Sequence, residues 1–287
     1  MKTPKRLQPL VDEGLIDEVL GQLMSGKEAT VYTVRCGAHI RCAKVYKEAN
    51  QRSFKQSAAY LEGRKTKNSR QARALEKGSR YGRQLQEETW QNSEIDALYR
   101  LATAGVRVPK PYICTDGVLL MDLVTDENGR AAPRLNDVSL SEAEALKLHQ
   151  MLLDQVILML CAGMIHGDLS EYNILVDSAG LVIIDLPQAI DAAGNNHAEK
   201  MFKRDVENLT IFFSYFAPEL TETQYAAEIW KLYESGDLKP DSALGLTGKV
   251  IYIEKEIDLE DVIKNIESAQ QEEDFRRMLK AERDADE

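Results

Sequence analysis

Three oxygen-bearing side chains in the middle of the chain are spaced so that they could hold a metal ion and accept a proton. In "IHGDLSEYNILVDSAGLVIIDLPQA", Asp168 and Asn173 lie five residues apart across a loop, and Asp185 follows the apolar stretch "LVII". A strand of that composition is expected in the interior, which would place Asp185 at the edge of a buried surface. Mg²⁺ takes few protein oxygens and completes its shell with water and phosphate, so Asn173 and Asp185 suit it as ligands.

The third side chain, Asp168, is offset from that pair and could receive or orient the proton of an attacking hydroxyl. Each of the three would be an ordinary loop residue on its own. Their ordered combination, H-x-D-x-x-x-x-N followed by a hairpin and I-D, is specific and predicts phosphate transfer from a nucleotide. His166, at the start of the loop, is expected to be structural rather than catalytic.

A lysine and a glutamate earlier in the chain are predicted to form an ion pair. "RCAKVYK" places Lys44 in an apolar strand, where a lone lysine usually faces solvent. In "EETWQNSEIDALYRLATAG", one helical face carries Trp90, Glu94, Leu98 and Leu101. A carboxylate in that stripe needs a partner, because burying it alone carries a heavy desolvation cost. Paired with Glu94, Lys44 would point at the α- and β-phosphates of a nucleotide; the alternative is a half-exposed glutamate at the edge of the stripe.

The stretch "GQLMSGKEATVY", residues 21–32, is one hydroxyl short of a Walker A loop, because Glu28 stands where that motif has Ser or Thr. The segments "ATVYTVR" and "IRCAKVYK", separated by the turn "CGAH", both have strand composition. The loop therefore joins two strands and opens no helix. A glycine loop over nucleotide phosphates fits this context better than a Walker A loop, and a plain Ser-Gly-Lys turn is the alternative.

The elements that must position these residues also have helix signals. "SLSEAEALKLHQMLLDQVILMLCAGM" is predicted to be a long amphipathic helix, with Ser141 and Glu144 spaced as a capping box and Gly163 placed to end it. The helix "KRDVENLTIFFSYF" is followed by "APEL", after which Thr221 and Gln224 are expected to begin the next helix.

Composition limits the class of protein. The 287 residues, 44% of them apolar, can bury the core of one large domain or two lobes. The four cysteines form no C-x-x-C pair, which argues against zinc and disulfides and favours a reducing cytoplasm, and no apolar stretch is long enough to cross a membrane.

Residues 49–83 hold a net charge of +8, which leaves −19 for the rest of the chain. This basic insertion could steer an acidic partner, or it could simply be a solvated insertion.

The sequence resembles the RIO family of atypical protein kinases. The resemblance rests on "SGKEATVY", "CAKVYK", "HGDLSEYNILV" and "IDLPQA" in family order, and it runs from about Leu10 to Phe216. It implies that Asp168 is the catalytic aspartate, that Lys44 and Glu94 form the ion pair, and that Asn173 and Asp185 bind the metal. It also implies that Ser25, Gly26 and Lys27 cover the phosphates of ATP.

By the same resemblance, "LLMDLV" is the hinge, with Met121 beside the adenine and backbone groups of Asp122 to Val124 bonding it. Further nucleotide contacts are implied for Val31, Ala43, Leu175 and Ile184. The implied fold is α+β and bilobal: a small antiparallel N-lobe with one regulatory helix, residues 1–124, a mainly helical, truncated C-lobe, residues 125–250, and a charged helical tail, residues 251–287. The lack of a preceding winged helix points to the RIO1-like branch and to a bacterial member.

The implied function is a cytoplasmic serine/threonine protein kinase that uses ATP and Mg²⁺, or Mn²⁺ in its place, and that phosphorylates itself. Some family members are described as ATPases that pass through a phosphate on the metal-binding aspartate, here Asp185. Gly167 replaces the Arg of an ordinary kinase H-R-D, so activity is not expected to depend on activation-loop phosphorylation.

Two alternatives stay open. A small-molecule kinase of the aminoglycoside or choline type also uses H-G-D and a later I-D. An ATP-switched assembly factor could bind RNA or ribosomal particles through residues 49–83.

Overall fold

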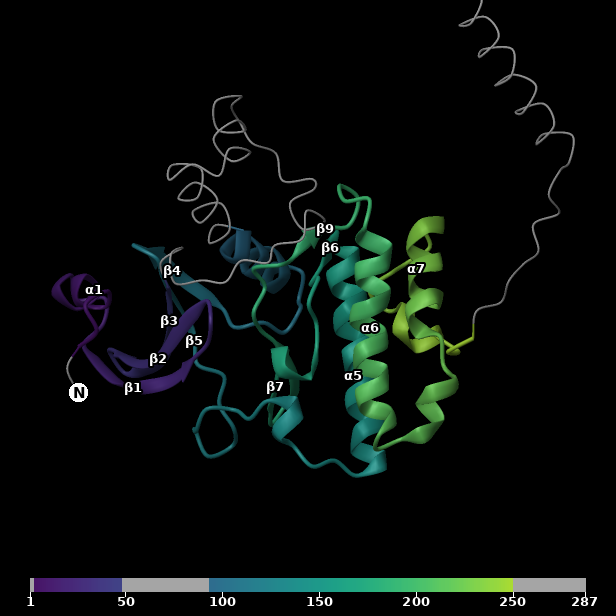
Figure 1. Cartoon of the computed structure of the whole chain (residues 1–287), viewed down its shortest axis with the longest axis horizontal. Coiled ribbons are helices and arrows are strands. Elements are labelled where there is room, and N and C mark those ends of the chain that lie inside the picture. Colours follow the sequence, from purple (N-terminus) through teal and green to yellow (C-terminus); the bar gives the residue numbers. More distant parts are fainter. Residues whose placement is uncertain (1–2, 48–92, 250–287) are drawn as a thin grey trace, which may run out of the picture. The chain divides into compact units, whose positions relative to one another are not determined.

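The computed structural model of the chain describes residues 3–47 and 93–249 (Figure 1). The basic insertion, Trp90 and the predicted tail, residues 251–287, lie outside the described residues. The chain divides into two compact units, Met1–Lys249 and Val250–Glu287, and everything described below belongs to the first. None of the helices in the two described ranges is long and apolar enough to cross a membrane.

The N-terminal part is an antiparallel sheet of five strands in the order β1-β2-β3-β5-β4, preceded by a short helix (Figure 1). These elements are α1 (Gln8–Asp12), β1 (Glu18–Ser25), β2 (Ala29–Cys36), β3 (His39–Tyr46), β4 (Pro111–Thr115) and β5 (Val118–Asp122). The two strands predicted after the glycine loop are therefore confirmed as β2 and β3. The loop itself joins β1 to β2 and opens no helix, as expected.

The two faces of this sheet pack into different apolar clusters, because side chains alternate along a strand. One face packs with α1 in a small cluster that includes Leu10, Val34, Ala43 and Leu120. The other face contributes Tyr46 and Leu119 to the large cluster that forms the core of the helical part. Lys44, which follows Ala43 in β3, is on the face that looks toward this large cluster. The alternation thus directs Lys44 toward the rest of the molecule.

A helix over residues 93–103 packs against the second face of the sheet. Leu98 and Leu101 are buried in the large cluster, and Glu94, one turn before Leu98, is 2% exposed. The prediction that Glu94 lies in the apolar stripe of this helix is confirmed. The carboxylate is thereby carried to the same side of the sheet as Lys44.

The C-terminal part is mainly helical, and its three long helices lie side by side (Figure 1). They are α5 (Glu142–Cys161), α6 (Ala198–Ser214) and α7 (Tyr225–Ser235), and the 3₁₀ turns are η2 (Leu135–Asp137), η3 (Glu171–Asn173), η4 (Pro218–Glu222) and η5 (Ser242–Gly245). The capping box of Ser141 and Glu144 is present at the start of α5, and Gly163, with φ +71°, follows its end. Both predictions for this helix are confirmed.

The expected start of the last helix is wrong. Thr221 belongs to η4, where its hydroxyl donates to the Pro218 carbonyl, and α7 begins after Gln224 without a side-chain cap. The backbone N–H of Gln224 donates to the Gly248 carbonyl instead. A proline-led 3₁₀ turn therefore takes the place that the sequence pattern assigned to a capping box.

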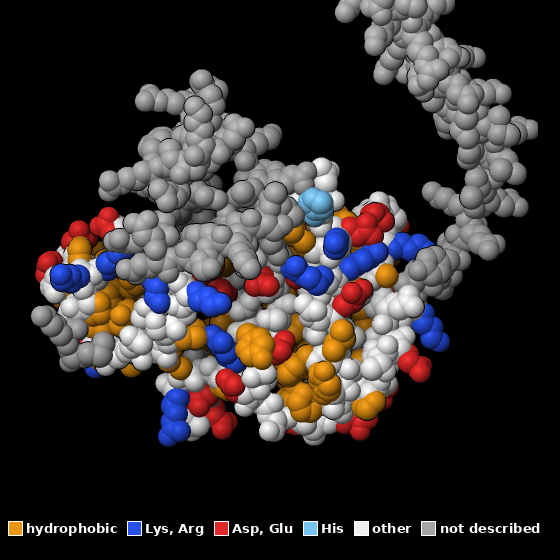
Figure 2. All heavy atoms as spheres, viewed as in Figure 1, with side chains coloured by type: hydrophobic (Ala, Val, Ile, Leu, Met, Phe, Trp, Pro, Cys, Tyr) orange, Lys and Arg blue, Asp and Glu red, His pale blue; other side chains and the backbone are white. Residues whose placement is uncertain are grey.

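Between the sheet and these helices run the short strands that carry the predicted site. They are β6 (Met164–Ile165), β7 (Ile174–Asp177), β8 (Gly180–Ile183) and β9 (Ile190–Asp191). β7 and β8 form an antiparallel hairpin, as predicted, and every residue of β8 is buried. β6 pairs with β9, so the chain leaves one short ladder, passes through the hairpin and returns to the same ladder. On the face seen in Figure 2, basic, acidic and apolar side chains of the described residues are interspersed.

Candidate functional site

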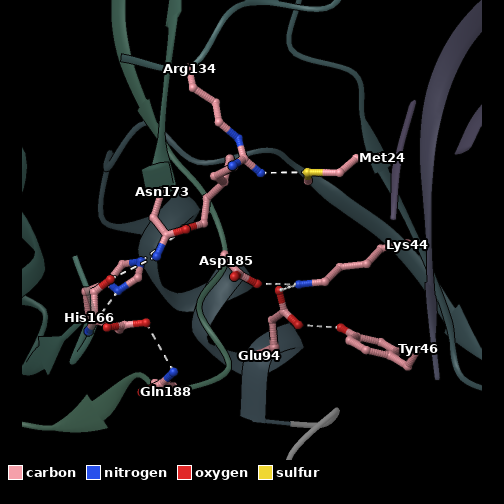
Figure 3. Close-up of polar contacts among 11 residues, drawn as sticks. Met24, Lys44, Tyr46, Glu94, Arg134, His166, Asn173, Asp185 and Gln188 are labelled. Carbon is pink, nitrogen blue, oxygen red and sulfur yellow. Dashed lines mark hydrogen bonds and ion pairs between the residues drawn. The ribbon is translucent and has the colours of Figure 1, made fainter. Parts of the chain in front are cut away.

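A buried ion cluster joins the sheet, the helix over residues 93–103 and the end of the hairpin (Figure 3). Lys44 Nζ donates to Glu94 Oε1 at 2.6 Å and to Asp185 Oδ1 at 2.7 Å. The second oxygen of Glu94 accepts from the Tyr46 hydroxyl at 2.5 Å. The predicted Lys44–Glu94 pair is therefore present, and Tyr46, which the sequence did not single out, completes the hydrogen bonds of Glu94.

The charges of this cluster do not balance. Burial by itself would lower the pKa of Lys44, but Asp185 and Glu94 outweigh burial and raise that pKa above its usual value. Lys44 is also the main reason why the pKa of the Asp185 carboxyl is lowered, in spite of desolvation. One ammonium thus faces two carboxylates. The excess negative charge favours a further cation at the exposed side of the cluster, where 44% of the Asp185 side chain is accessible.

His166, which is 2% exposed, anchors the loop that carries Asp168 through hydrogen bonds to the backbone. The Asp168 backbone N–H donates to His166 Nδ1 at 3.3 Å, so the other ring nitrogen is the donor to the Ile184 carbonyl, 3.0 Å away. Both partners of the imidazole are backbone groups, one in each of the two segments that carry aspartates. This arrangement supports the structural role expected for His166.

A second anchor comes from helix α6 and was missed by the sequence analysis. Asp205, 2% exposed, accepts from the Gly167 backbone N–H at 2.7 Å, and the neighbouring Arg204 donates to the Gly167 carbonyl. Both hydrogen-bonding groups of Gly167 are thereby fixed. The signal was available: Asp205 stands four residues after Met201 and four before Leu209, in the middle of an apolar stripe, just as Glu94 does.

Asp168 itself faces Gln188, whose side-chain amide donates to Asp168 Oδ2 at 3.2 Å (Figure 3). Burial raises the pKa of the Asp168 carboxyl above its ordinary value, although the charge of Arg204 opposes the shift. Gln188 follows Asp185 by three residues and was also missed. The hydrogen bond from Gln188 to Oδ2 holds the Asp168 carboxylate in one orientation. It thereby sets the direction in which the other oxygen, Oδ1, points.

Asn173 and Asp185 belong to two chain segments that are hydrogen-bonded to each other. The Asn173 side-chain amide donates to the Asp168 carbonyl at 2.9 Å, and the Ile184 N–H donates to the Asn173 carbonyl at 3.0 Å. Asp185 adopts the left-handed region with φ +65°, which is uncommon outside glycine and is typical of functional positions. Because its NH₂ group is engaged by Asp168, Asn173 offers its amide oxygen as an acceptor. That oxygen and the Asp185 carboxylate form a donor set that fits Mg²⁺.

The face of the sheet that looks toward this cluster can be read from the strand register. Val31 and Leu119 are the partners of Lys44 in β2 and β5, and Cys42 is the partner of Met121. The implied nucleotide contacts Val31 and Met121 thus lie on the Lys44 face.

The side chain of Ala43 lies on the opposite face, in the cluster with α1, so the implied nucleotide contact of Ala43 stays a prediction that its side chain does not support. Cys42, 5% exposed, lies two residues before Lys44 and therefore on the Lys44 face.

The predicted hinge follows β5, and part of its backbone is already bonded. The Asp122 N–H donates to the Lys110 carbonyl, and the Val124 carbonyl accepts from the Ala132 N–H. The Asp122 N–H is therefore no longer free for the adenine, whereas the Val124 carbonyl keeps a second lone pair. The other backbone groups of Asp122 to Val124, those of Leu123 included, remain predicted adenine contacts.

The other implied contacts lie at two ends of the site. Ser25, Gly26 and Lys27 are exposed at the tip between β1 and β2, where the Gly26 N–H donates to the Ala29 carbonyl at 2.9 Å. Leu175 and Ile184, both half-buried, belong to the hairpin region next to Asn173 and Asp185. The implied nucleotide contacts other than Ala43 thus belong to the tip, to the Lys44 face of the sheet with its hinge, and to the hairpin.

Comparisons with known proteins identify relatives. A RIO domain family model matches residues 30–226. The RIO-type serine/threonine-protein kinase Rio1 of Haloferax volcanii is 35% identical over 205 residues, covering 71% of this chain and 66% of the relative. The serine/threonine-protein kinase rio1 of Schizosaccharomyces pombe is 32% identical over 221 residues, covering 74% of this chain but only 41% of the relative.

A solved structure shows the fold. The Rio2 kinase of Chaetomium thermophilum, in a complex described as ADP/Mg²⁺-phosphoaspartate, is similar with a TM-score of 0.55 at 21% identity, covering 92% of this chain and 75% of that one. The bilobal kinase-like α+β fold implied by the sequence is confirmed. The names of the sequence relatives support the RIO1-like branch; they come from archaea and eukaryotes, and the expected bacterial source stays a prediction.

Proposed function

The chain belongs to the RIO domain family, and from this premise we propose that it is an ATP- and Mg²⁺-dependent serine/threonine protein kinase. The observation that carries the proposal is the contact of Lys44 with both Glu94 and Asp185, directly beside the Asp168 loop. In protein kinases a strand lysine paired with a helix glutamate points at the phosphates, and a nearby aspartate binds Mg²⁺, which is the set of residues brought together here. The protein substrate includes the chain itself.

In this proposal the adenine contacts Val31 and Met121 and the backbone of the hinge, and Lys44 binds the α- and β-phosphates. Asp168 accepts the proton of the attacking hydroxyl, whose oxygen forms a bond to the γ-phosphorus while the bond to the β,γ-bridging oxygen breaks and ADP leaves. Gln188 keeps the Asp168 carboxylate directed at the hydroxyl. Bound by Asn173 and Asp185, Mg²⁺, or Mn²⁺ in its place, would neutralise charge on the phosphates.

A second outcome at the same site is phosphate transfer to Asp185. The observation that favours it is the 44% exposure of the Asp185 side chain, against 9% for Lys44. A carboxylate oxygen would displace ADP, and water would then hydrolyse the acyl phosphate, which amounts to ATPase activity. The solved Rio2 complex is described as containing phosphoaspartate.

The test follows labelled phosphate from [γ-³²P]ATP into the chain, into a generic protein and into free phosphate, with and without RNA. We expect label on serine or threonine that resists hydroxylamine, and label on Asp185 would be released by it. Asp168→Asn should abolish transfer to hydroxyls, whereas Asp137→Asn, which makes the same change at an exposed carboxylate, should not. Turnover that appears only with RNA, without labelled protein, would favour the assembly factor instead.

The basic insertion offers hydroxyls for autophosphorylation at Ser53, Ser57, Thr66, Ser69 and Ser79. Peptide mapping after incubation with Mg·ATP would locate the phosphate. Label elsewhere would contradict this location without contradicting kinase activity. A cytoplasmic location is part of the proposal, supported by the four cysteines, all of which are free.

A further inference from the structure

Arg134 lies at the edge of the site, between the hairpin and strand β1. Its backbone is fixed to the hairpin, because Arg134 forms a β-bridge with Leu175 and the Val176 N–H donates to the Pro133 carbonyl at 2.9 Å. Its side chain reaches away from the hairpin to strand β1, where Nη2 donates to the Met24 sulfur at 2.7 Å (Figure 3). The guanidinium therefore lies between the hairpin and the strand that leads into the glycine loop.

The partner of Arg134 is a poor one. A thioether sulfur is a weak acceptor, whereas a guanidinium has five N–H donors in a planar fork that matches carboxylates and phosphates. Met24 is itself 39% exposed and stands directly before Ser25, Gly26 and Lys27. A phosphate oxygen at this place would be a much stronger partner than sulfur.

The charges around the site leave a need for such a cation. Between Asp168 and Asn173 the loop reads Leu-Ser-Glu-Tyr, which contains no basic residue. Lys44 is already engaged by two carboxylates and lies deep in the cluster. The bridge of Arg134 to Leu175 and its contact with Met24 place its charge between the hairpin that connects Asn173 to Asp185 and the strand that leads to the glycine loop. A terminal phosphate held by the metal ligands and covered by that loop would lie next to this charge.

We propose that Arg134 binds the γ-phosphate of ATP, exchanging the Met24 sulfur for phosphate oxygens. This inference rests on the proposed function and deepens it, since it names the residue that distinguishes ATP from ADP. Arg134 belongs to the segment after the hinge. It supplies the positive charge that the Asp168–Asn173 loop lacks. In the absence of nucleotide, Met24 keeps the guanidinium near its binding position, so little ordering is required when ATP arrives.

The experiment compares the affinities of the full chain for Mg·ADP and for Mg²⁺ with the non-hydrolysable β,γ-imido analogue of ATP, by calorimetry. Arg134→Gln should weaken binding of the analogue about 10- to 100-fold, the worth of a charge-assisted hydrogen bond, and change ADP binding less than about threefold. Arg134→Lys should recover part of the loss, because it keeps the charge but not the fork. Arg130→Gln, the same change at an exposed arginine four residues earlier, should bind both nucleotides like the unaltered chain.

Met24→Leu separates phosphate binding from a purely structural contact. If Arg134 acts on phosphate, Met24→Leu leaves the preference for the analogue over ADP unchanged; if it only ties β1 to the hairpin, both variants lose affinity for both nucleotides alike. Equal loss of ADP and analogue in Arg134→Gln, or no loss, would overturn the inference while the kinase proposal stands. An unaltered chain that binds neither nucleotide would overturn both. Thermal unfolding of each variant shows whether it is folded.

Discussion

Lys44 joins two carboxylates that would otherwise repel each other in a buried site, so its removal should affect both activity and stability. We expect Lys44→Met to abolish phosphate transfer and to lower the free energy of unfolding by roughly 3 to 5 kcal/mol, because Glu94 loses its charged partner at 2% exposure. The double variant Lys44→Met with Glu94→Gln should regain stability but not activity. Urea unfolding and a transfer assay give the two quantities, and near-normal turnover in the single variant would remove Lys44 from the site.

Gln188 is expected to act through Asp168 rather than on the nucleotide. Gln188→Leu removes the hydrogen bond to Asp168 Oδ2, so the carboxylate can turn away from the attacking hydroxyl. A fall in kcat of about 10-fold or more, with little change in the KM for ATP, is the expected result. Gln188→Asn, which keeps an amide, tests whether some activity returns. An equal rise in KM would mean that Gln188 binds nucleotide instead.

Residues in an ordered motif could be predicted from the sequence, and so could Lys44 and Glu94, because each places a charge in an apolar stretch. Asp168, Asn173 and Asp185 are brought together because a short loop and a hairpin connect them. Tyr46 and Gln188 were missed because their roles depend on distances between side-chain atoms, which the sequence does not give. Cys42 could have been placed on the Lys44 face from the sequence, because side chains alternate along a strand and Ala43 stands next to Lys44.

Helix α5 contributes apolar side chains to the core next to the site, and a capping box stabilises its first turn. Ser141→Ala should lower the free energy of unfolding by about 1 kcal/mol, because the Glu144 backbone N–H loses its side-chain acceptor. Activity should be unchanged. Ser139→Ala, the same change two residues earlier at an exposed position, is the control and should leave unfolding unchanged. Equal losses in both variants would mean that the cap contributes nothing of its own.

The ends of helices differed in how well the sequence indicated them. Ser141 and Gly163 were correct because a capping box and a left-handed glycine depend only on neighbouring residues. Thr221 was wrong because its hydroxyl turns back to Pro218, a choice made by the preceding 3₁₀ turn. The N–H of Gln224 is satisfied by Gly248, twenty-four residues later, which no local pattern could indicate.

The stability of the whole molecule should depend on pH through His149. Burial lowers the pKa of this side chain from 6.5 to about 4, where it contacts Thr210 and the rings of Phe213 and Tyr225. Between these values the unfolded chain binds a proton that the folded chain does not, so stability falls as pH falls from about 6.5 to 4. The loss attributable to His149 amounts to about 3 kcal/mol.

Urea unfolding at pH 7 and at pH 4.5 measures this dependence. His149→Gln should reduce the difference between the two conditions, whereas His39→Gln, at an exposed histidine, should not. Buried carboxyls with raised pKa values, such as Asp205, act in the opposite direction near the lower pH, but they are common to all three proteins. The same pH difference in the His149 variant and the unaltered chain would contradict the assignment.

The pairing of β6 with β9 has a consequence for how the site is lost. The ladder joins Met164 to Asp191 and Ile165 to Ile190, so the chain from residue 166 to residue 189 forms a loop closed at its base. Asp168, Asn173 and Asp185 all lie within that loop. If the base opens, all three are released in one cooperative event while the five-stranded sheet and α5 stay folded. Hydrogen exchange should therefore show one shared opening rate across residues 165–190, and inactivation by mild denaturant should be all-or-none, without a form that keeps only part of its catalytic carboxylates.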